Sequence, residues 1–152
     1  MNTETTAVSI IQHQATTDDI PFLTDTFLRA MQPHITAARG HWNELREREQ
    51  FLDQLSLHST SIIQHDGASV GFLTAVIHPQ HVELHTLCIA PEHQSRGLGT
   101  TVSRQVIADA RSRKLHVVLY VLKSNPRARL LYELLGFIPI GESAHHIQMR
   151  LS

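Results

Sequence analysis

The chain has 152 residues, 41% of them hydrophobic and 18% charged, and its net charge is −1. This length and composition exclude wholesale disorder and predict a single domain over residues 1–152. A single cysteine, Cys88, excludes a disulfide framework and a cysteine-based zinc cluster, and the 5% of aromatic residues disfavours a surface for stacking nucleic-acid bases.

The N-terminal part of the chain predicts a strand followed by a helix. Residues 8–12 favour a short strand, and the run 17–19 (Thr-Asp-Asp) with Pro21 is typical of a helix start. We expect Pro33 and Gly40 to interrupt this helix, because proline lacks the backbone N–H that a helix interior needs and glycine favours helix ends.

A second, highly charged helix is expected over residues 43–57. Its glutamates alternate with arginines, which indicates a solvated outer face. We expect its buried side to consist of Leu45, Phe51, Leu52 and Leu55.

The middle of the chain predicts three consecutive strands. A strong hairpin turn, Asp-Gly at 66–67, joins strands expected at 60–65 and 69–77. A second turn, Pro-Gln at 79–80, precedes the third strand, at 82–90.

The C-terminal part changes to an alternation of helices and strands. We expect helices at 98–113 and 126–135, and strands at 116–122, 137–140 and 147–151. Gly136 is the expected stop of the second helix.

The resulting order is β-α-α-β-β-β-α-β-α-β-β. An antiparallel meander followed by a β-α-β crossover predicts a mixed α/β sheet with helices on its faces. The crossover strands, 82–90 and 116–122, are expected to be parallel and joined by a right-handed connection.

A glycine-containing loop at the start of the 98–113 helix is the first candidate site. Its residues are Gln94, Ser95, Arg96, Gly97, Leu98, Gly99 and Thr100. Unpaired amides and the dipole at a helix start favour an anion such as phosphate, although a tight loop before a helix explains the same pattern. The loop is neither a Walker loop nor a dinucleotide-binding fingerprint.

Two motifs together resemble the GNAT superfamily of acetyl-CoA-dependent N-acetyltransferases. They are Gln-x-x-Gly-x-Gly at 94–99 and Asn-x-x-Ala-x-x-x-Tyr-x-x-x-Gly-Phe at 125–137. The match runs from about residue 83 to 137, and the order of elements extends it over most of the chain. The resemblance implies a GNAT-type acyltransferase fold in which two parallel central strands splay apart around coenzyme A.

The resemblance also implies how acetyl-CoA binds. The backbone of Leu87, Cys88 and Ile89 would pair with the pantetheine arm, and the amides of residues 94–100 would hold the pyrophosphate. Asn125 and the helix start after it, including Ala128, would contact the pantetheine or adenine side. Three arginines, Arg96, Arg127 and Arg129, are equal candidates for the 3′-phosphate.

The reaction needs a proton donor and a base. By resemblance, Tyr132 is the acid that protonates the leaving thiolate, although a tyrosine packed in the helix stripe is the alternative. Glu83 and His85 are candidate bases, and ordered water alone is a third possibility. Strand alternation predicts that one face carries His81, Glu83, His85, Leu87 and Ile89.

Cys88 is an alternative, ping-pong nucleophile that we discount. An apolar mid-strand position raises the pKa of a thiol and makes it inert. The superfamily typically transfers the acetyl group directly in a ternary complex.

A primary amine of a small molecule or peptide is the expected acceptor. Trp42 and Glu44 could hold an ammonium by cation–π and Coulomb attraction, although packing under the helix explains Trp42 as well. By resemblance to a GNAT subset, the region near Trp42 and the histidine pair of His145 and His146 border the acceptor pocket. A homodimer is common for this fold.

The charge distribution agrees with an anionic cofactor. Residues 1–95 contain 11 acidic and 4 basic side chains, a net of −7, whereas residues 96–152 contain 3 acidic and 9 basic, a net of +6. The first part therefore favours a cationic acceptor and the second an anion, although a chance division of surface charge gives the same numbers.

Other functions are weaker interpretations. A GNAT fold can also sense acyl-CoA without catalysis and act through a partner protein. The twelve histidines form no metal-binding motif, so no metal is expected. The pI of about 6.9 argues against nucleic acid. The chain has no long apolar run, and residues 1–6 lack the pattern of a signal peptide. These two absences predict a cytoplasmic protein without a membrane partner.

Overall fold

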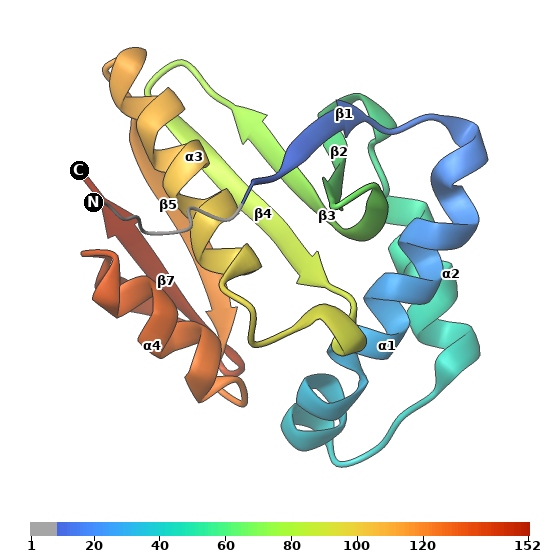
Figure 1. The fold of residues 1–152 in the computed structure, drawn as a ribbon. Helices are drawn as coiled ribbons and strands as arrows, with labels where there is room; N and C mark the ends of the chain where they lie inside the picture. Colours follow the sequence, from blue (N-terminus) through green and yellow to red (C-terminus); the bar gives the residue numbers. More distant parts are fainter. Residues whose placement is uncertain (1–8) are drawn as a thin grey trace.

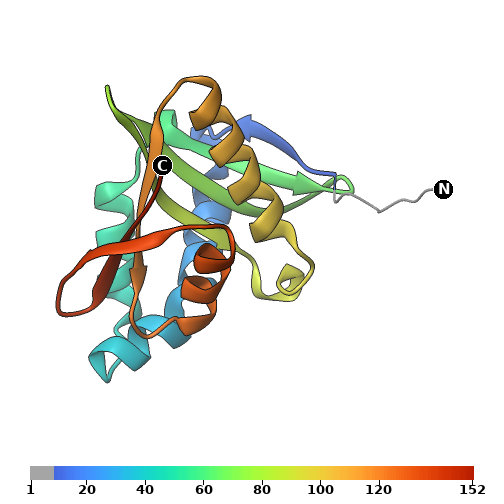
Figure 2. The ribbon, with the colours of Figure 1, turned by 90° about the vertical axis from the view of Figure 1, so that its left-hand side faces the viewer.

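The computed structural model describes residues 9–152, which form a seven-stranded mixed sheet between two layers of helices (Figures 1 and 2). The strands are β1 (Ile11–Gln14), β2 (Thr60–His65), β3 (Ala68–Ile77), β4 (His81–Ile89), β5 (His116–Leu122), β6 (Ile138–Glu142) and β7 (His146–Leu151). The helices are α1 (Ile20–Arg39), α2 (Glu44–Gln54), α3 (Leu98–Ser112) and α4 (Pro126–Leu134), with short 3₁₀ turns η1 (Thr17–Asp19), η2 (Leu57–Ser59) and η3 (Pro91–His93). The predicted mixed α/β class is confirmed.

The sheet separates two hydrophobic cores. Its order is β1-β2-β3-β4-β5-β7-β6, in which β4 and β5 are parallel, as predicted, and the other neighbours are antiparallel. Helices α3 and α4 cover one face over a core that includes Val102 and Leu119. Helices α1 and α2 cover the other face over a core that includes Leu23 and Phe72.

The N-terminal elements differ from the predictions in two places. Strand β1 begins at Ile11 rather than at Val8, and Val8 and the polar segment 1–6 lie outside the described residues. Helix α1 continues through Pro33 and ends at Arg39, where Gly40, with a φ of 81°, caps it. Pro33 is exposed, so solvent can satisfy the carbonyl that its missing N–H leaves free.

The buried side of α2 was predicted wrongly in part. The helix ends at Gln54, and Leu45 and Leu52 are exposed, at 66% and 42%. Glu47, which we interpreted as solvated, is only 6% exposed because it forms an ion pair with Arg39 of α1. A partner on α1 thus allows a carboxylate to lie on the inner side of α2.

A bulge in β4 divides the strand into two parts. Ala75 of β3 pairs with Leu84, but the preceding Thr74 pairs with Thr86, so His85 is the extra residue. One extra residue reverses the alternation of side chains beyond it. Leu87 therefore packs in the same core as Leu84, and the prediction that Glu83 and Leu87 share a face is wrong.

The ladder between β4 and β5 stops where the bulge begins. Pairing runs from His81↔His116 to Leu84↔Leu119, although β4 continues to Ile89. Beyond that point the two strands diverge, which confirms the splayed parallel pair. A bulge bends the strand that carries it, which explains the divergence.

Helix α1 is attached to both sides of this opening. Arg29 forms an ion pair with Glu92 in the turn that follows β4. Ser124, which follows β5, donates a hydrogen bond from Oγ to the carbonyl oxygen of His34 at 2.7 Å. Among the described residues, no helix is long and apolar enough to cross a membrane.

Replacing Gly71 with alanine tests the close packing of β3 behind the opening. A Cβ at Gly71 would collide with the carbonyl oxygen of Cys88 and lie 3.0 Å from the Cα of Ile89. We expect Gly71→Ala to lower the free energy of unfolding by about 1–3 kcal/mol, measured by urea denaturation. The matched control is Gly99→Ala, where the nearest atom is 3.9 Å away on Leu131. Equal stability of the two variants would contradict this packing.

Candidate active site

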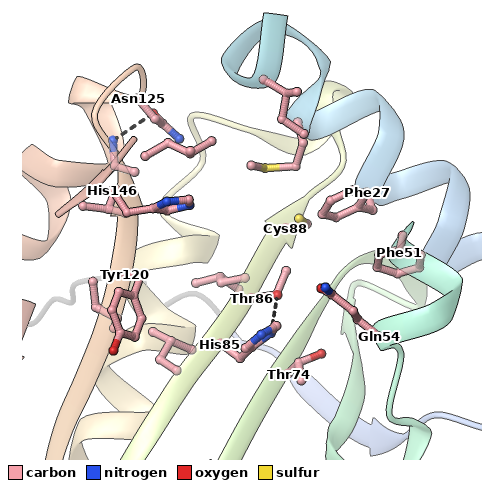
Figure 3. A pocket seen from close by; sticks show the side chains of 18 of the residues that line it. Phe27, Phe51, Gln54, Thr74, His85, Thr86, Cys88, Tyr120, Asn125 and His146 are labelled. Carbon is pink, nitrogen blue, oxygen red and sulfur yellow. Dashed lines mark hydrogen bonds between the residues drawn. The ribbon is translucent and has the colours of Figure 1, made fainter. Parts of the chain in front are cut away.

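A cavity of about 610 Å³ lies where β4 and β5 diverge (Figure 3). Its lining comes from α1, α2, β3, β4, β5, α4 and the β6–β7 hairpin. Figure 3 shows Cys88 between a wall that carries His146 and Asn125 and a wall that carries Phe27 and Phe51. The volume is that of a site for a small molecule or a chain end rather than for a folded partner.

The aromatic wall belongs to the core beneath α1 and α2. The rings of Phe27 and Phe51 are stacked with centroids 4.5 Å apart, and Phe51 meets Phe72 edge-on. These contacts fix α1 against α2 on one side of the cavity. The sequence did not identify either phenylalanine as part of a site.

Both candidate bases line the cavity. The carboxylate of Glu83 accepts a hydrogen bond from His78, with 3.1 Å between Oε1 and Nε2. His85 is exposed, and its Nδ1 lies 3.0 Å from the hydroxyl of Thr86 (Figure 3). Glu83 is thus oriented by a side chain from the β3–β4 turn, which the sequence did not indicate.

The phenol of Tyr132 is buried beside the cavity. Burial raises the pKa of Tyr132 to about 12, the nearby Cys88 adds to the rise, and the Ser103 hydroxyl opposes it. The ring packs edge-on against Phe137, with centroids 5.5 Å apart. Tyr132 therefore keeps its proton at neutral pH while lining the cavity.

The thiol of Cys88 also lines the cavity and is 2% exposed. Burial raises the pKa of Cys88 to about 12. A thiol with this pKa is protonated at neutral pH and is a poor nucleophile.

The loop before α3 presents a run of free amides. Within residues 9–152, the backbone N–H groups of 95–100 have no backbone acceptor. Ser95 and Gly97 have positive φ angles of 65° and 78°, and Gly97 is the N-cap of α3. Consecutive amides at such a turn form a concave anion site. The side chain of Gln94 instead donates a hydrogen bond to the carbonyl oxygen of Ile89.

Helix α4 lies beside that loop. The guanidinium of Arg127 donates a hydrogen bond to the hydroxyl of Ser95. Asn125 caps α4 by accepting a hydrogen bond from the amide of Ala128, and both residues line the cavity. Arg129 is paired with Glu133 on the same helix.

The predicted cofactor residues fall into two groups. Leu87, Cys88, Asn125, Ala128 and Tyr132 line the cavity. The remaining residues lie outside the cavity lining, and they are Ile89, the loop 94–100, Arg127 and Arg129.

The predicted acceptor residues are divided as well. His145 lines the cavity, whereas Trp42 and Glu44 lie outside its lining. Glu44 is exposed and pairs with Arg48 on the outer side of α2. The nearby Asn43 caps α2 by accepting a hydrogen bond from the amide of Arg46.

Two charged residues of the cavity were not identified as site residues from the sequence. They are Arg39 and Glu47. His145 and His146, the pair named from the sequence, both line the cavity. Burial lowers the pKa of His146, and the nearby His145 and Arg39 lower it further. Nothing local in the sequence indicates that Arg39 and Glu47 turn inward. In the described part of the chain, no group of three or more His, Cys, Asp or Glu is placed to hold a metal ion.

Comparison with known families gives a match over most of the chain. The model of the acetyltransferase (GNAT) family matches residues 23–137. The mycothiol acetyltransferase of Thermomonospora curvata is 34% identical over 105 residues, which are 65% of this chain and 34% of that protein. The chain spans only 22–37% of the length of the curated relatives that it matches.

Solved structures share the fold at low sequence identity. The PaiA N-acetyltransferase of Thermoplasma acidophilum, in complex with coenzyme A, has a TM-score of 0.75 at 17% identity and covers 93% of this chain and 98% of its own. The ribosomal-protein-S18-alanine N-acetyltransferase of Escherichia coli has a TM-score of 0.70 at 20% identity and covers 94% and 93%.

Thiol labelling tests the protonation state and burial of Cys88. With a pKa of about 12, roughly one thiol in ten thousand is ionised at pH 8. We expect iodoacetamide to leave the native protein unmodified over an hour, as followed by intact mass spectrometry. The same protein unfolded in guanidinium chloride should gain one adduct. Rapid labelling of the native protein would contradict the buried, protonated thiol.

Proposed function

This chain belongs to the acetyltransferase (GNAT) family, and from this membership we propose that it transfers an acetyl group from acetyl-CoA to a primary amine. We also propose that residues 1–152 act as one domain in this reaction and that the protein works in the cytoplasm. One observation carries the proposal: the buried, protonated Tyr132 lines a cavity that opens where β4 leaves β5.

The residues present fit coenzyme A. Beyond Leu84 the edge of β4 has no partner on β5, so backbone groups of residues 87–89 on this edge are available to an extended arm, except for the Ile89 carbonyl, which accepts from Gln94. The free amides of residues 95–100 suit a pyrophosphate. Arg96 and Arg127 lie in or against this loop and are suited to a further phosphate, whereas Arg129 is already paired with Glu133.

When bound, acetyl-CoA supplies the activated acetyl thioester. The chain's own contribution to the chemistry begins with Tyr132, whose Oη holds a proton that it can give to a leaving thiolate. Its pKa of about 12 keeps it in the acid form across the neutral range.

The base that takes the proton of the amine is Glu83 or His85. Both line the cavity, and both can act directly or through water. The hydrogen bond from His78 orients the carboxylate of Glu83, which supports Glu83 as the first candidate.

Direct transfer in a ternary complex is the mechanism that the site supports. Cys88, the cavity thiol, is buried and protonated, which disfavours an acetyl-cysteine intermediate. The cavity is lined by α4 on one side of the sheet and by α1 and α2 on the other. Thioester and amine can therefore meet from opposite faces, which favours catalysis by alignment.

The acceptor class is supported by the names of similar proteins. The curated relatives are mycothiol acetyltransferases, and one structural neighbour acetylates the alanine of a ribosomal protein. We propose a primary amine of a small molecule or peptide, with His145 at the acceptor end of the cavity.

Replacing Tyr132 with phenylalanine tests the proposed acid. Phenylalanine keeps the edge-on contact with Phe137 and removes only the hydroxyl. We expect kcat to fall by about 10²–10⁴-fold, measured by CoA release with a panel of amines. Acetyl-CoA affinity, measured by calorimetry, should change little.

The pH profile provides the matching check on Tyr132. Because its pKa is raised to about 12, the acid form is nearly complete below about pH 10 and is lost as the pH rises through 12. Turnover should therefore show no alkaline decline attributable to Tyr132 below pH 10. Near-normal turnover of Tyr132→Phe would remove this residue from the mechanism.

Matched glutamine variants separate the two candidate bases. We expect Glu83→Gln to reduce kcat by about 10²–10⁴-fold and His85→Gln to reduce it less. His78→Gln should give an intermediate loss of kcat, because His78 orients the Glu83 carboxylate. A larger loss in His85→Gln would assign the role of base to His85. Small losses in both variants would indicate that ordered water alone accepts the proton of the amine.

A further inference from the structure

The acceptor side of the cavity contains an ion pair between two helices. Nη1 of Arg39, the last residue of α1, lies 3.5 Å from Oε2 of Glu47 in α2. The Glu47 side chain is 8% exposed, whereas that of Arg39 is 35% exposed, and both line the cavity. The guanidinium side chain is thus more exposed than the carboxylate with which it pairs.

The guanidinium of Arg39 has unused hydrogen-bonding capacity. Guanidinium offers five N–H donors in a planar fork that matches a carboxylate. Within residues 9–152, the Arg39 side chain has no hydrogen bond, and its one ionic contact uses a single nitrogen. The other donors are available to a molecule in the cavity.

A second nitrogen donor lies near this guanidinium. His146 points into the cavity from β7 (Figure 3), and Arg39 is close enough to lower its pKa. A neutral imidazole still donates one N–H. His145, which lies near His146, also lines the cavity.

The two carboxylates in the cavity lining do not make it a site for a cation. Among the described acidic residues of the first 95 positions, only Glu47 and Glu83 line the cavity. Glu47 is paired with Arg39 and Glu83 with His78. The net charge of −7 in that part of the chain is therefore not directed at the acceptor, which weakens the expectation of a cationic group beyond the amine.

We propose that the amine acceptor carries a carboxylate, as a free amino acid or a related amino acid derivative does, and that Arg39 binds this carboxylate with His146 beside it. The inference rests on the proposed acetyl transfer and specifies its substrate class. The aromatic wall of Phe27 and Phe51 suits an apolar side chain on the same molecule. Arg39 is a binding residue, and the amine remains free for transfer.

Matched acceptors test the carboxylate directly. Alanine, leucine and phenylalanine are each compared with the corresponding amino acid amide and with the amine that lacks the carboxyl group. We expect the best amino acid to exceed its amide and its amine in kcat/KM by about ten- to a hundredfold, the usual effect of a charge-assisted hydrogen bond. The difference should lie mainly in KM.

Variants of Arg39 link this preference to the guanidinium. Arg39→Gln alone leaves Glu47 buried without its partner, so the double variant Arg39→Gln/Glu47→Gln keeps the site neutral. Arg39→Lys keeps the charge but removes the planar fork. The double variant should lose the preference for the acid, and Arg39→Lys should reduce it. Arg46→Gln, at an exposed position of α2 outside the cavity, is the matched control and should retain it.

Binding without turnover gives an independent measurement. The carboxylate 4-methylpentanoate has no amine and should bind to the wild-type protein in calorimetry, whereas 4-methylpentanamide should not. Binding of the carboxylate should be lost in the double variant and kept in Arg46→Gln. Circular dichroism and thermal melting confirm that each variant is folded.

The outcomes separate the two proposals. Two outcomes would overturn the carboxylate inference and leave acetyl transfer intact. One is equal rates for amino acids and their amides, and the other is transfer only to amines that lack a carboxylate. An acid preference that survives in the double variant would overturn the role of Arg39. Failure of every amine, with acetyl-CoA bound, would overturn the proposed transfer and this inference with it.

Discussion

One irregularity in backbone pairing creates the site. The extra residue at His85 interrupts the register between β3 and β4, and the β4–β5 ladder ends beside it at Leu84. Because each strand keeps its outer neighbour, the divergence exposes backbone groups without unravelling the sheet. The same bulge turns Leu87 toward the α3 core and leaves Cys88 on the α1 side. The opening and its lining therefore have a single cause.

Burial, rather than partner charges, sets the chemistry of this opening. Tyr132 and Cys88 are both protonated because removal from water disfavours their anions. One consequence is that Tyr132 keeps its proton without help from a neighbouring group. Another is that the Cys88 thiol does not compete as a nucleophile. The polar residues that do face open space, Glu83 and Arg39, are each held by one partner.

The sequence predicted what depends on local patterns. The turn at Asp66 and Gly67, the stop at Gly136 and the loop before α3 follow from short runs of residues, and the bounds of β5 match the apolar run at 116–122. Features that depend on distant partners were missed. The bulge at His85 exists only through pairing with β3, and the burial of Glu47 exists only through Arg39 on another helix. A regular alternation of faces was the best expectation without that knowledge.

Two contacts of different kinds attach α1 to the two sides of the opening. One is an ion pair between exposed side chains, Arg29 and Glu92, and the other is a neutral hydrogen bond from Ser124 to the backbone of His34. Dissolved salt screens the first and leaves the second almost untouched. A rise in ionic strength therefore weakens the attachment of α1 on the β4 side more than its attachment on the β5 side, while the buried face of α1 keeps the helix in place.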